Sequence, residues 1–263
     1  GLDLLCALLV EAGSAEALDL QGIKADRMPV MAGGIAIMSA VFEELGIETM
    51  SYADGALRLG VLYDLLGRYH HQDMRDSTVA QFRRRYQVEV NQSERVEATA
   101  LSALTELAEG APGMADVQFL SWAAHLHEIG ISVAHSAYHK HGAYILTYAD
   151  MPGFSKRDQA RLAMLVLAHR GTLDKLRALP AVDSAWRLIF SLRLAVLLHR
   201  TRDDRALPTW RVAATSGGFR LDLPAGWLAE NPWTAAALSE EAAVWREIGR
   251  DYTVKSMAMR WQA

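Results

Sequence analysis

Histidine side chains gather in the middle of the sequence. Six of the nine histidines lie between positions 125 and 169, namely His125, His127, His135, His139, His141 and His169. An imidazole can bind a metal ion, act as an acid or base, or donate hydrogen bonds to phosphate oxygens. Residues 125–169 are therefore the first candidate for a chemical site, with hydrogen-bonded packing of the histidines as the simpler alternative.

A basic segment overlaps the histidines. Residues 155–205 contain eleven Lys or Arg and five Asp, so this segment has a formal charge of +6 in a chain of net charge −4. A basic stretch in an acidic protein can focus positive potential toward an anionic partner. The alternative is a solvated helix face with no partner.

The pair His127-Glu128 follows an apolar stretch and is similar to the central pair of the HD phosphohydrolase superfamily. There, an adjacent His-Asp pair, an upstream His and a downstream Asp bind a metal that activates water. In this chain Glu128 replaces the Asp, residues 91–96 contain no histidine, and residues 192–199 contain no acid. We therefore expect a metal-free, HD-like helical fold, and leave residual metal binding near His127, His141 and His169 open.

Helical spacing of apolar residues dominates the chain and predicts a mainly α protein. After a first helix that ends near Gly13, helices are expected at residues 35–45, 54–67, 73–86, 91–109, 116–130, 137–147, 155–170, 183–201 and 233–250. Gly46 suits a helix C-terminus, and Ser155 suits a helix N-terminus. Residues 23–31 are expected to form a linker or short strand that ends at Gly33-Gly34, and residues 48–52 a short strand.

The composition changes after Asp203. Residues 210–214 and 219–223 flank Ser216-Gly217-Gly218, which predicts a β-hairpin. The last dozen residues are expected to add a strand. The prediction for this end of the chain is a small α+β domain.

Motifs of one protein family run along the whole chain. They are residues 26–37, 54–62, 127–130 (His-Glu-Ile-Gly), 135–136, 139–146, 150–154 and 168–170 (Ala-His-Arg). Together they resemble the exopolyphosphatase and guanosine pentaphosphate phosphohydrolase family. One departure is Leu59, where the family commonly has Glu.

This resemblance implies a division into three regions. Residues 1–68 would be the C-terminal remnant of the second actin-like domain of an ASKHA α/β fold, residues 69–203 an HD-like helical bundle, and residues 204–263 the small α+β domain. In the family, a cleft between two actin-like domains holds Mg²⁺ and the terminal phosphate, and a glutamate activates water. We expect that machinery to precede residue 1, so no catalytic residue, metal ligand or cofactor is expected in this chain, which should be inactive alone.

The resemblance also gives the basic segment a partner. Family members hold polyphosphate in a basic channel and form homodimers, which implies that this region binds inorganic polyphosphate and supports a dimer. The favoured polyphosphate contacts are Lys140, His141, His169, Arg170, Lys175 and Arg177. Arg27, Gly33 and Gly34 are candidate phosphate or nucleotide contacts. His127 and Glu128 are expected to be a buried structural pair that shares a hydrogen bond.

Two other function classes stay open. One is an autonomous, metal-dependent HD-type nucleotide phosphohydrolase, and the other is a purely structural dimerisation module. A preference between polyphosphate and guanosine pentaphosphate is also open, because both activities share these motifs.

The composition indicates where in the cell the protein is expected. With 51% hydrophobic and 22% charged residues, the chain is typical of a soluble globular protein. Cys6 is the one cysteine, no apolar run reaches about 20 residues, and no basic segment precedes the apolar start. We expect a cytoplasmic protein that binds neither a membrane nor, for want of a recognition motif, a specific nucleic acid.

Overall fold

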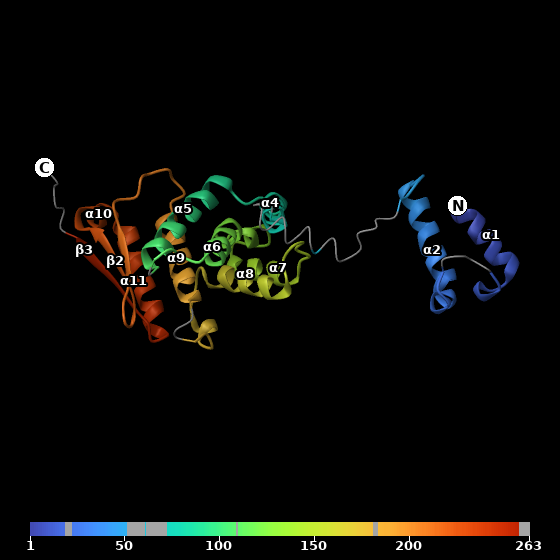
Figure 1. Cartoon of the computed structure of the whole chain (residues 1–263). Helices are drawn as coiled ribbons and strands as arrows, with labels where there is room; N and C mark the ends of the chain where they lie inside the picture. The colour runs from blue at the N-terminus through green and yellow to red at the C-terminus, as the bar shows by residue number, and fades with distance from the viewer. Residues whose placement is uncertain (19–22, 52–60, 62–72, 109, 181–183, 258–263) are drawn as a thin grey trace. The chain divides into compact units, whose positions relative to one another are not determined.

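The computed structural model describes residues 1–18, 23–51, 61, 73–108, 110–180 and 184–257 (Figure 1). The chain divides into two compact units, residues 1–60 and residues 61–263. The predicted boundary at residue 68 lies outside the described residues. The described part is mostly helical with a small three-stranded sheet, as the sequence predicted.

The first unit pairs two apolar helices. Helix α1 (Leu2–Ala12) packs against α2 (Met28–Leu45), with the short 3₁₀ turns η1 (Ala15–Ala17) and η2 (Ala25–Arg27) between them. Both helices end at a glycine in the left-handed region, Gly13 and Gly46, with φ of 71° and 60°. A left-handed residue is the usual way to stop a helix, and the prediction for Gly46 is confirmed.

Helix α2 starts earlier than predicted. Residues 28–31 are helical rather than a linker or strand, and Gly33-Gly34 lies inside α2 instead of breaking the chain before it. Pro29 in the first turn fits the start of the helix, because it lacks an N–H that would have no partner there. Two interior glycines cost about 1 kcal/mol each relative to alanine, which the rest of this 18-residue helix tolerates.

Two further predictions concern the end of the first unit. Residues 48–51 are not in a strand. The helix predicted at residues 54–67 and Tyr52 lie outside the described residues, apart from Val61. Among the described helices, α2 is long and apolar enough to cross a membrane by length and composition. The expected absence of a membrane partner stays a prediction.

The second unit begins with six helices at the positions the sequence predicted. They are α4 (Met74–Arg85), α5 (Val90–Leu107), α6 (Met114–Leu126), α7 (Tyr138–Tyr148), α8 (Lys156–Ala168) and α9 (Ala185–Leu198). The 3₁₀ turns η3 (Ile129–Ser132) and η4 (Asp174–Leu176) lie between them. Ser155 caps α8 as predicted, since its hydroxyl accepts from Asp158 N while the Asp158 carboxylate accepts from Ser155 N.

These helices pack around one apolar core. Helix α5 contacts α6 and α9, α7 contacts α8, and α6 contacts α8 and α9. The core includes large side chains that are almost fully buried, among them Leu120, Trp122, Leu165, Leu188 and Ile189. Burial of each such side chain contributes about 1.5–3 kcal/mol, so this core stabilises the whole bundle.

A small sheet follows the bundle. Strand β1 (Arg211–Ala214) pairs antiparallel with β2 (Gly218–Pro224), which confirms the predicted hairpin. Helices α10 (Ala225–Glu230) and α11 (Pro232–Glu247) then lead to β3 (Asp251–Met257), which pairs parallel with β2. In Figure 1 these elements lie together at the end of the second unit where the chain is coloured orange to red.

Aromatic side chains join the sheet to the bundle. Phe190 of α9 stacks on Phe219 of β2, with ring centroids 4.3 Å apart, and packs edge-on against Trp245 of α11 and Tyr252 of β3. The predicted boundary at residues 203–204 falls in the irregular segment 202–210. The core nevertheless runs across it, so the helical and α+β parts are packed as one body.

Candidate functional site

A cavity of about 900 Å³ opens where several helices end. We call it the helix-end cavity. Its lining comes from the end of α6 (Glu128), the start of α7 (Tyr138), the end of α8 (His169, Arg170) and the segment after α9 (Arg200, Arg202), together with residues of α5, α9 and α11. Helix ends bring unpaired backbone groups and capping side chains together, so such a meeting point is rich in polar groups.

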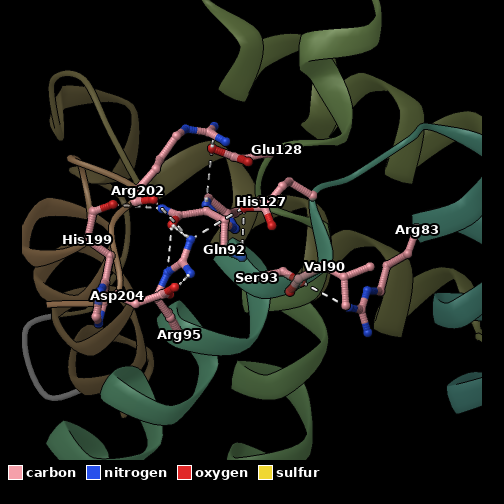
Figure 2. A network of polar contacts seen from close by, with 11 residues as sticks. Arg83, Val90, Gln92, Ser93, Arg95, His127, Glu128, His199, Arg202 and Asp204 are labelled. Atoms are coloured by element: carbon pink, nitrogen blue, oxygen red, sulfur yellow. Dashed lines mark hydrogen bonds and ion pairs between the residues drawn. The ribbon is translucent and has the colours of Figure 1, made fainter. Parts of the chain in front are cut away.

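Glu128 and Arg202 form one ion pair of the cavity, and Arg193 and Glu241 form another. The Glu128 carboxylate is buried, and it accepts a hydrogen bond from Arg202 Nη2. The Arg202 side chain is 44% exposed, so the guanidinium faces both the carboxylate and the cavity. Figure 2 shows the two side chains pointing toward each other from opposite sides. Arg202 thus lies at the cavity wall with its charge paired to Glu128.

A polar network fixes the backbone that carries Arg202. Gln92 Nε2 donates to His199 O at 2.8 Å, and the Arg95 guanidinium contacts Asp204 at 2.5 Å and Arg202 O at 3.4 Å (Figure 2). Arg202 itself has φ of 57°, a left-handed conformation that is uncommon outside glycine. The contacts from α5 supply the tertiary restraint that such a conformation needs.

Tyr138 and Arg170 form the wall beside this pair. The Arg170 guanidinium lies 4.8 Å from the centre of the Tyr138 ring, a cation–π distance. Burial raises the pKa of Tyr138, and the nearby positive charge of Arg170 opposes part of that rise. Glu128 and Arg202 also act electrostatically on Tyr138, which places all four side chains in one cluster.

His127 and His169 end their helices in the same way. Each Nδ1 lies 2.6 Å from a carbonyl oxygen three residues earlier, Ala124 O for His127 and Val166 O for His169. A carbonyl only accepts, so Nδ1 carries the proton in both rings and Nε2 carries a lone pair. Both Nε2 atoms are buried and have no hydrogen bond partner among the described residues. The two rings stand 5.3 Å apart.

Burial keeps these imidazoles neutral. It lowers the pKa of His127, and it lowers the pKa of His169 well below the ordinary value, with the neighbouring His127 adding to the effect on His169. A neutral imidazole with Nδ1 occupied offers an acceptor at Nε2 and no donor. The predicted contact of His169 with a phosphate oxygen therefore needs a proton from elsewhere, because two acceptors repel.

Basic side chains surround a third buried histidine. Burial, followed by the charges of Lys175, Arg170 and Lys140, lowers the pKa of His139 to about 4. The structure therefore brings together three of the cations that the sequence predicted as polyphosphate contacts. All three residues are exposed, and they form a basic surface next to the helix-end cavity, which Arg170 also lines.

The other predicted contacts lie elsewhere or have other partners. Lys175 Nζ donates to Leu167 O and Arg170 O, so it caps the end of α8, and desolvation of this ammonium lowers its pKa to about 8. Arg177 pairs with Asp174 and donates to Glu247 O. It lines a second cavity, between η4 and the β1–β2 hairpin. His141 lies on α7 and does not line the helix-end cavity.

The predicted phosphate turn at Gly33-Gly34 is wrong in its geometry. Only the first four N–H groups of a helix are free to meet a phosphate, and α2 begins at Met28. The N–H groups of Gly33 and Gly34 are therefore used inside the helix. Arg27 lies exposed at the start of α2, at the N-cap position.

The expected buried pair of His127 and Glu128 is corrected in one respect. Both residues are buried, but His127 Nε2 lies 3.8 Å from Glu128 Oε1, which is too long for a hydrogen bond. The partner of Glu128 is Arg202, 74 positions away. No spacing in the sequence predicts the contact between Glu128 and Arg202. Gly130, in the same motif, is required by packing, since a Cβ there would lie 2.0 Å from Tyr138 O.

A metal does not fit this cluster. In the described ranges, no group of three or more His, Cys, Asp or Glu side chains is placed to hold a metal ion. Both Nδ1 atoms are engaged by carbonyls, and Arg202 occupies the Glu128 carboxylate.

Comparisons with known proteins cover both units. The family model "Ppx/GppA phosphatase, domain III" matches residues 74–242, and the model "Ppx/GppA phosphatase family" matches residues 1–69. The motifs that carried the resemblance in the sequence lie within or beside these two ranges.

Three curated relatives share the name guanosine-5'-triphosphate,3'-diphosphate pyrophosphatase. The protein from Pseudoalteromonas translucida is 36% identical over 240 residues, covering 89% of this chain and 48% of the relative. That from Aeromonas hydrophila is 36% identical over 252 residues (91% and 50%), and that from Photobacterium profundum is 34% identical over 238 residues (89% and 48%). The chain spans about half the length of these relatives.

Proposed function

The chain belongs to the Ppx/GppA phosphatase family, and from this premise we propose that it is the C-terminal, polyphosphate-binding and dimer-forming region of a phosphoanhydride hydrolase. The full-length enzyme would remove the terminal phosphate from inorganic polyphosphate with Mg²⁺. The chain corresponds to about half of its relatives, and the proposal places catalysis in the other half. Alone, this chain would bind without turnover.

The group of exposed cations around His139, at the edge of the helix-end cavity, is the observation that supports binding. Lys140, Arg170 and Lys175 are exposed and lie around His139. The cavity itself is lined by equal numbers of basic and acidic side chains, namely Arg170, Arg193, Arg200, Arg202, Glu89, Glu128, Glu240 and Glu241. Polyphosphate carries about one charge per unit, so contacts with several cations release counterions and make binding steeply salt-dependent. We propose that the chain of phosphates passes Lys140 and Lys175 and enters the cavity at Arg170.

The fold assignment within the family is also a proposal. We assign residues 1–68 to the end of an actin-like domain, residues 69–203 to an HD-like bundle, and residues 204–263 to the α+β domain. The two family matches, which meet between residues 69 and 74, support the first division. A cytoplasmic location is in keeping with Cys6 as the one cysteine of the chain.

A second candidate substrate comes from the relatives. Their printed name describes a pyrophosphatase acting on guanosine-5'-triphosphate,3'-diphosphate. A full-length enzyme that acts on this nucleotide would still present an anionic ligand to the cations around His139. The two substrates differ in length, so chain-length dependence of binding separates them.

Binding to polyphosphate of hundreds of units and of about ten units, across a salt series, tests the proposal. We expect tighter binding of the longer chains, steep loss of affinity with salt, and no release of phosphate. Tight binding of the guanosine polyphosphate without any effect of polyphosphate length would favour the second candidate. No binding at low salt would overturn both and leave a structural, dimerising module. Metal-stimulated nucleotide hydrolysis would instead favour an HD-type enzyme.

A matched pair of variants locates the site. Arg170→Gln should weaken polyphosphate binding about tenfold or more, because a hydrogen bond to a charged group contributes about 1.5–3 kcal/mol. It should also reduce the slope of log K against log salt by about 0.7. Arg157→Gln makes the same charge change at the other, exposed end of α8 and should alter neither quantity. Equal effects of both variants would mean that binding follows overall charge and not the cavity.

A further inference from the structure

We propose that the second cavity, between η4 and the β1–β2 hairpin, is an anion-binding site of its own whose ligand carries several linked phosphate groups. We call it the hairpin cavity. Its volume is about 900 Å³. The site goes beyond the proposed function, which places binding at the cations around His139.

The charge of its lining distinguishes the hairpin cavity from the helix-end cavity. Among the described residues that line the hairpin cavity, three are basic and none is acidic; the basic ones are Arg177, Arg187 and Arg250. The described lining of the helix-end cavity contains four Arg and four Glu. A concave surface with charges of one sign attracts ligands of the opposite sign. Of the two cavities, the hairpin cavity is therefore the one that favours an anion.

Two carboxylates lie near these arginines. Asp174 pairs with Arg177, and both side chains are more than half exposed. An exposed ion pair of this kind contributes little to stability, so a phosphate group can take the place of Asp174. Asp251 lies against the hairpin turn, since a Cβ on Gly217 would be 2.7 Å from Asp251 Oδ2. Neither carboxylate is among the lining residues that the structure describes.

Trp186 positions one of the three arginines. Its side chain is buried, its Nε1 donates to Pro180 O at 2.9 Å, and its ring packs edge-on against Trp245. The Arg250 guanidinium lies 4.1 Å from the centre of the Trp186 ring, a cation–π distance. A guanidinium already held on a ring loses less conformational freedom when it binds a phosphate oxygen. Burial also lowers the pKa of Arg250 by desolvating its charge, and a bound anion would offset that cost.

The other two arginines come from separate elements. Arg187 lies in the first turn of α9 and is half-buried. Arg177 is the C-cap residue of η4, and its Nη2 donates to Glu247 O, at the end of α11, at 2.9 Å. The exposed side chains of Ser184 and Ser216 add hydroxyl donors to the lining. Cations from three parts of the fold around one cavity suit a ligand with several phosphate groups better than a single small anion.

The turn η4 connects the hairpin cavity to the cations around His139. Lys175 belongs to those cations and Arg177 to the hairpin cavity, and Leu176 alone separates them. Their Cα atoms are therefore at most about 7 Å apart. A long polyphosphate would reach both places, and its second contact would form at a high effective concentration. This consequence rests on the proposed function, whereas the hairpin site itself does not.

Calorimetric titration with linear inorganic triphosphate at pH 7.5 and low salt tests the site. Triphosphate should bind, and Arg187→Gln should weaken its binding about tenfold, the factor that corresponds to one lost hydrogen bond between charged groups. Arg157→Gln makes the same charge change at the start of α8, outside both cavities, and should leave the affinity unchanged. No binding, no effect of Arg187→Gln, or an equal loss in both variants would overturn the inference.

A chemical measurement on the unsubstituted protein covers the case in which Arg187→Gln does not fold. Phenylglyoxal modifies arginine side chains, and mass spectrometry of proteolytic peptides reports the extent of modification at each arginine. Triphosphate should protect Arg177, Arg187 and Arg250, and it should leave the modification of Arg157 unchanged. Protection of Arg170 alone would assign triphosphate to the cations around His139 and overturn the inference.

The two proposals fail separately. Binding of long polyphosphate that depends on Arg170, together with triphosphate binding that does not depend on Arg187, would overturn the hairpin site alone. Triphosphate binding that depends on Arg187, together with long-chain binding that does not depend on Arg170, would overturn the proposed function alone. If both hold, Arg187→Gln should weaken the binding of long polyphosphate as well, because one of its two contacts is lost.

Discussion

The two compact units use apolar residues in opposite ways. In the first unit, α1 and α2 are rich in Leu, Ile, Val and Met, yet the buried apolar residues described there are Ala15 and Ile35. Val30, Ile37 and Leu45 of α2 are exposed. In the second unit, α5, α6, α8 and α9 bury their apolar faces in a shared core.

The difference shows that apolar composition does not by itself make a core. Two helices can bury only the stripe along which they touch, so most of the apolar surface of α1 and α2 stays uncovered. Six helices and a sheet enclose one another, and the core residue Trp122 is 1% exposed as a result. The number of packed elements, and not hydrophobicity, decides how much each side chain stabilises.

A leucine-to-alanine substitution in each unit should give the largest difference in the free energy of unfolding. Leu165→Ala, in the buried middle of α8, should lower the free energy of unfolding by about 2–5 kcal/mol through lost burial and a cavity. Leu45→Ala, at a position 71% exposed, should change it by less than about 0.5 kcal/mol. All seven tryptophans lie beyond residue 121, so tryptophan fluorescence in urea measures unfolding of the second unit. Hydrogen exchange of residues 2–45 measures opening of the first unit.

A large loss of protection on Leu45→Ala would break the comparison. It would mean that α2 buries this side chain in solution against a partner, for example a second copy of the chain. Sedimentation at two protein concentrations distinguishes self-association from a change within the unit.

Acid should affect the units differently. The second unit buries His127, His139, His169 and His199, and burial lowers the pKa of each, to about 4 for His139. The unfolded chain therefore takes up protons that the folded chain does not, so stability is fully present above the ordinary value of about 6.5 and falls as the pH drops from there toward 4. Residues 1–60 contain no histidine and lack this effect.

Urea unfolding followed by fluorescence at pH 7.5 and pH 5.5 measures this loss. The midpoint should be lower at pH 5.5, while helix protection in residues 2–45 stays the same. An unchanged midpoint would show that the histidines are accessible to protons in the folded state. His139→Gln removes one of the four groups and should reduce the difference between the two pH values.

Removal of a helix N-cap residue should give the smallest difference in stability between the two units. Ser155→Ala removes the cap of α8 and should cost about 1 kcal/mol, read from the same urea midpoint. The first-unit counterpart is Arg27, at the N-cap of α2, whose side chain makes no cap hydrogen bond. Arg27→Ala should leave the exchange rates of α2 nearly unchanged. A comparable loss in both variants would contradict the cap assignment.

Much of the second unit could be predicted from the sequence because its signals are local. Apolar residues at helical spacing located the six helices of the bundle, and Ser155 marked the start of α8. Ser216-Gly217-Gly218 between residues 210–214 and 219–223 located the hairpin of β1 and β2. The first unit was harder, because Gly33-Gly34 suggested a break that the surrounding helical residues override.

The candidate site was predicted in part. The family resemblance, together with the basic segment, implied contacts at His169, Arg170, Lys140 and Lys175, which the structure brings near His139 and the cavity. The role of Arg202 was missed, because its contact with Glu128 joins residues 74 positions apart. The mechanism assumed for His169 was also incomplete, since the residue type does not tell which ring nitrogen is engaged.

The sequence by itself determined the family, the helices and the local caps, since these depend on residue types within a few positions of one another. Only the tertiary structure decided which helix ends meet, that Arg202 faces Glu128, and that His169 is buried with Nε2 unpaired among the described residues. The physical reason is that charge pairing, burial and the free side of an imidazole depend on neighbours in space. Those neighbours come from α6, α7, α8 and the segment after α9, and only the packing of the core brings them together.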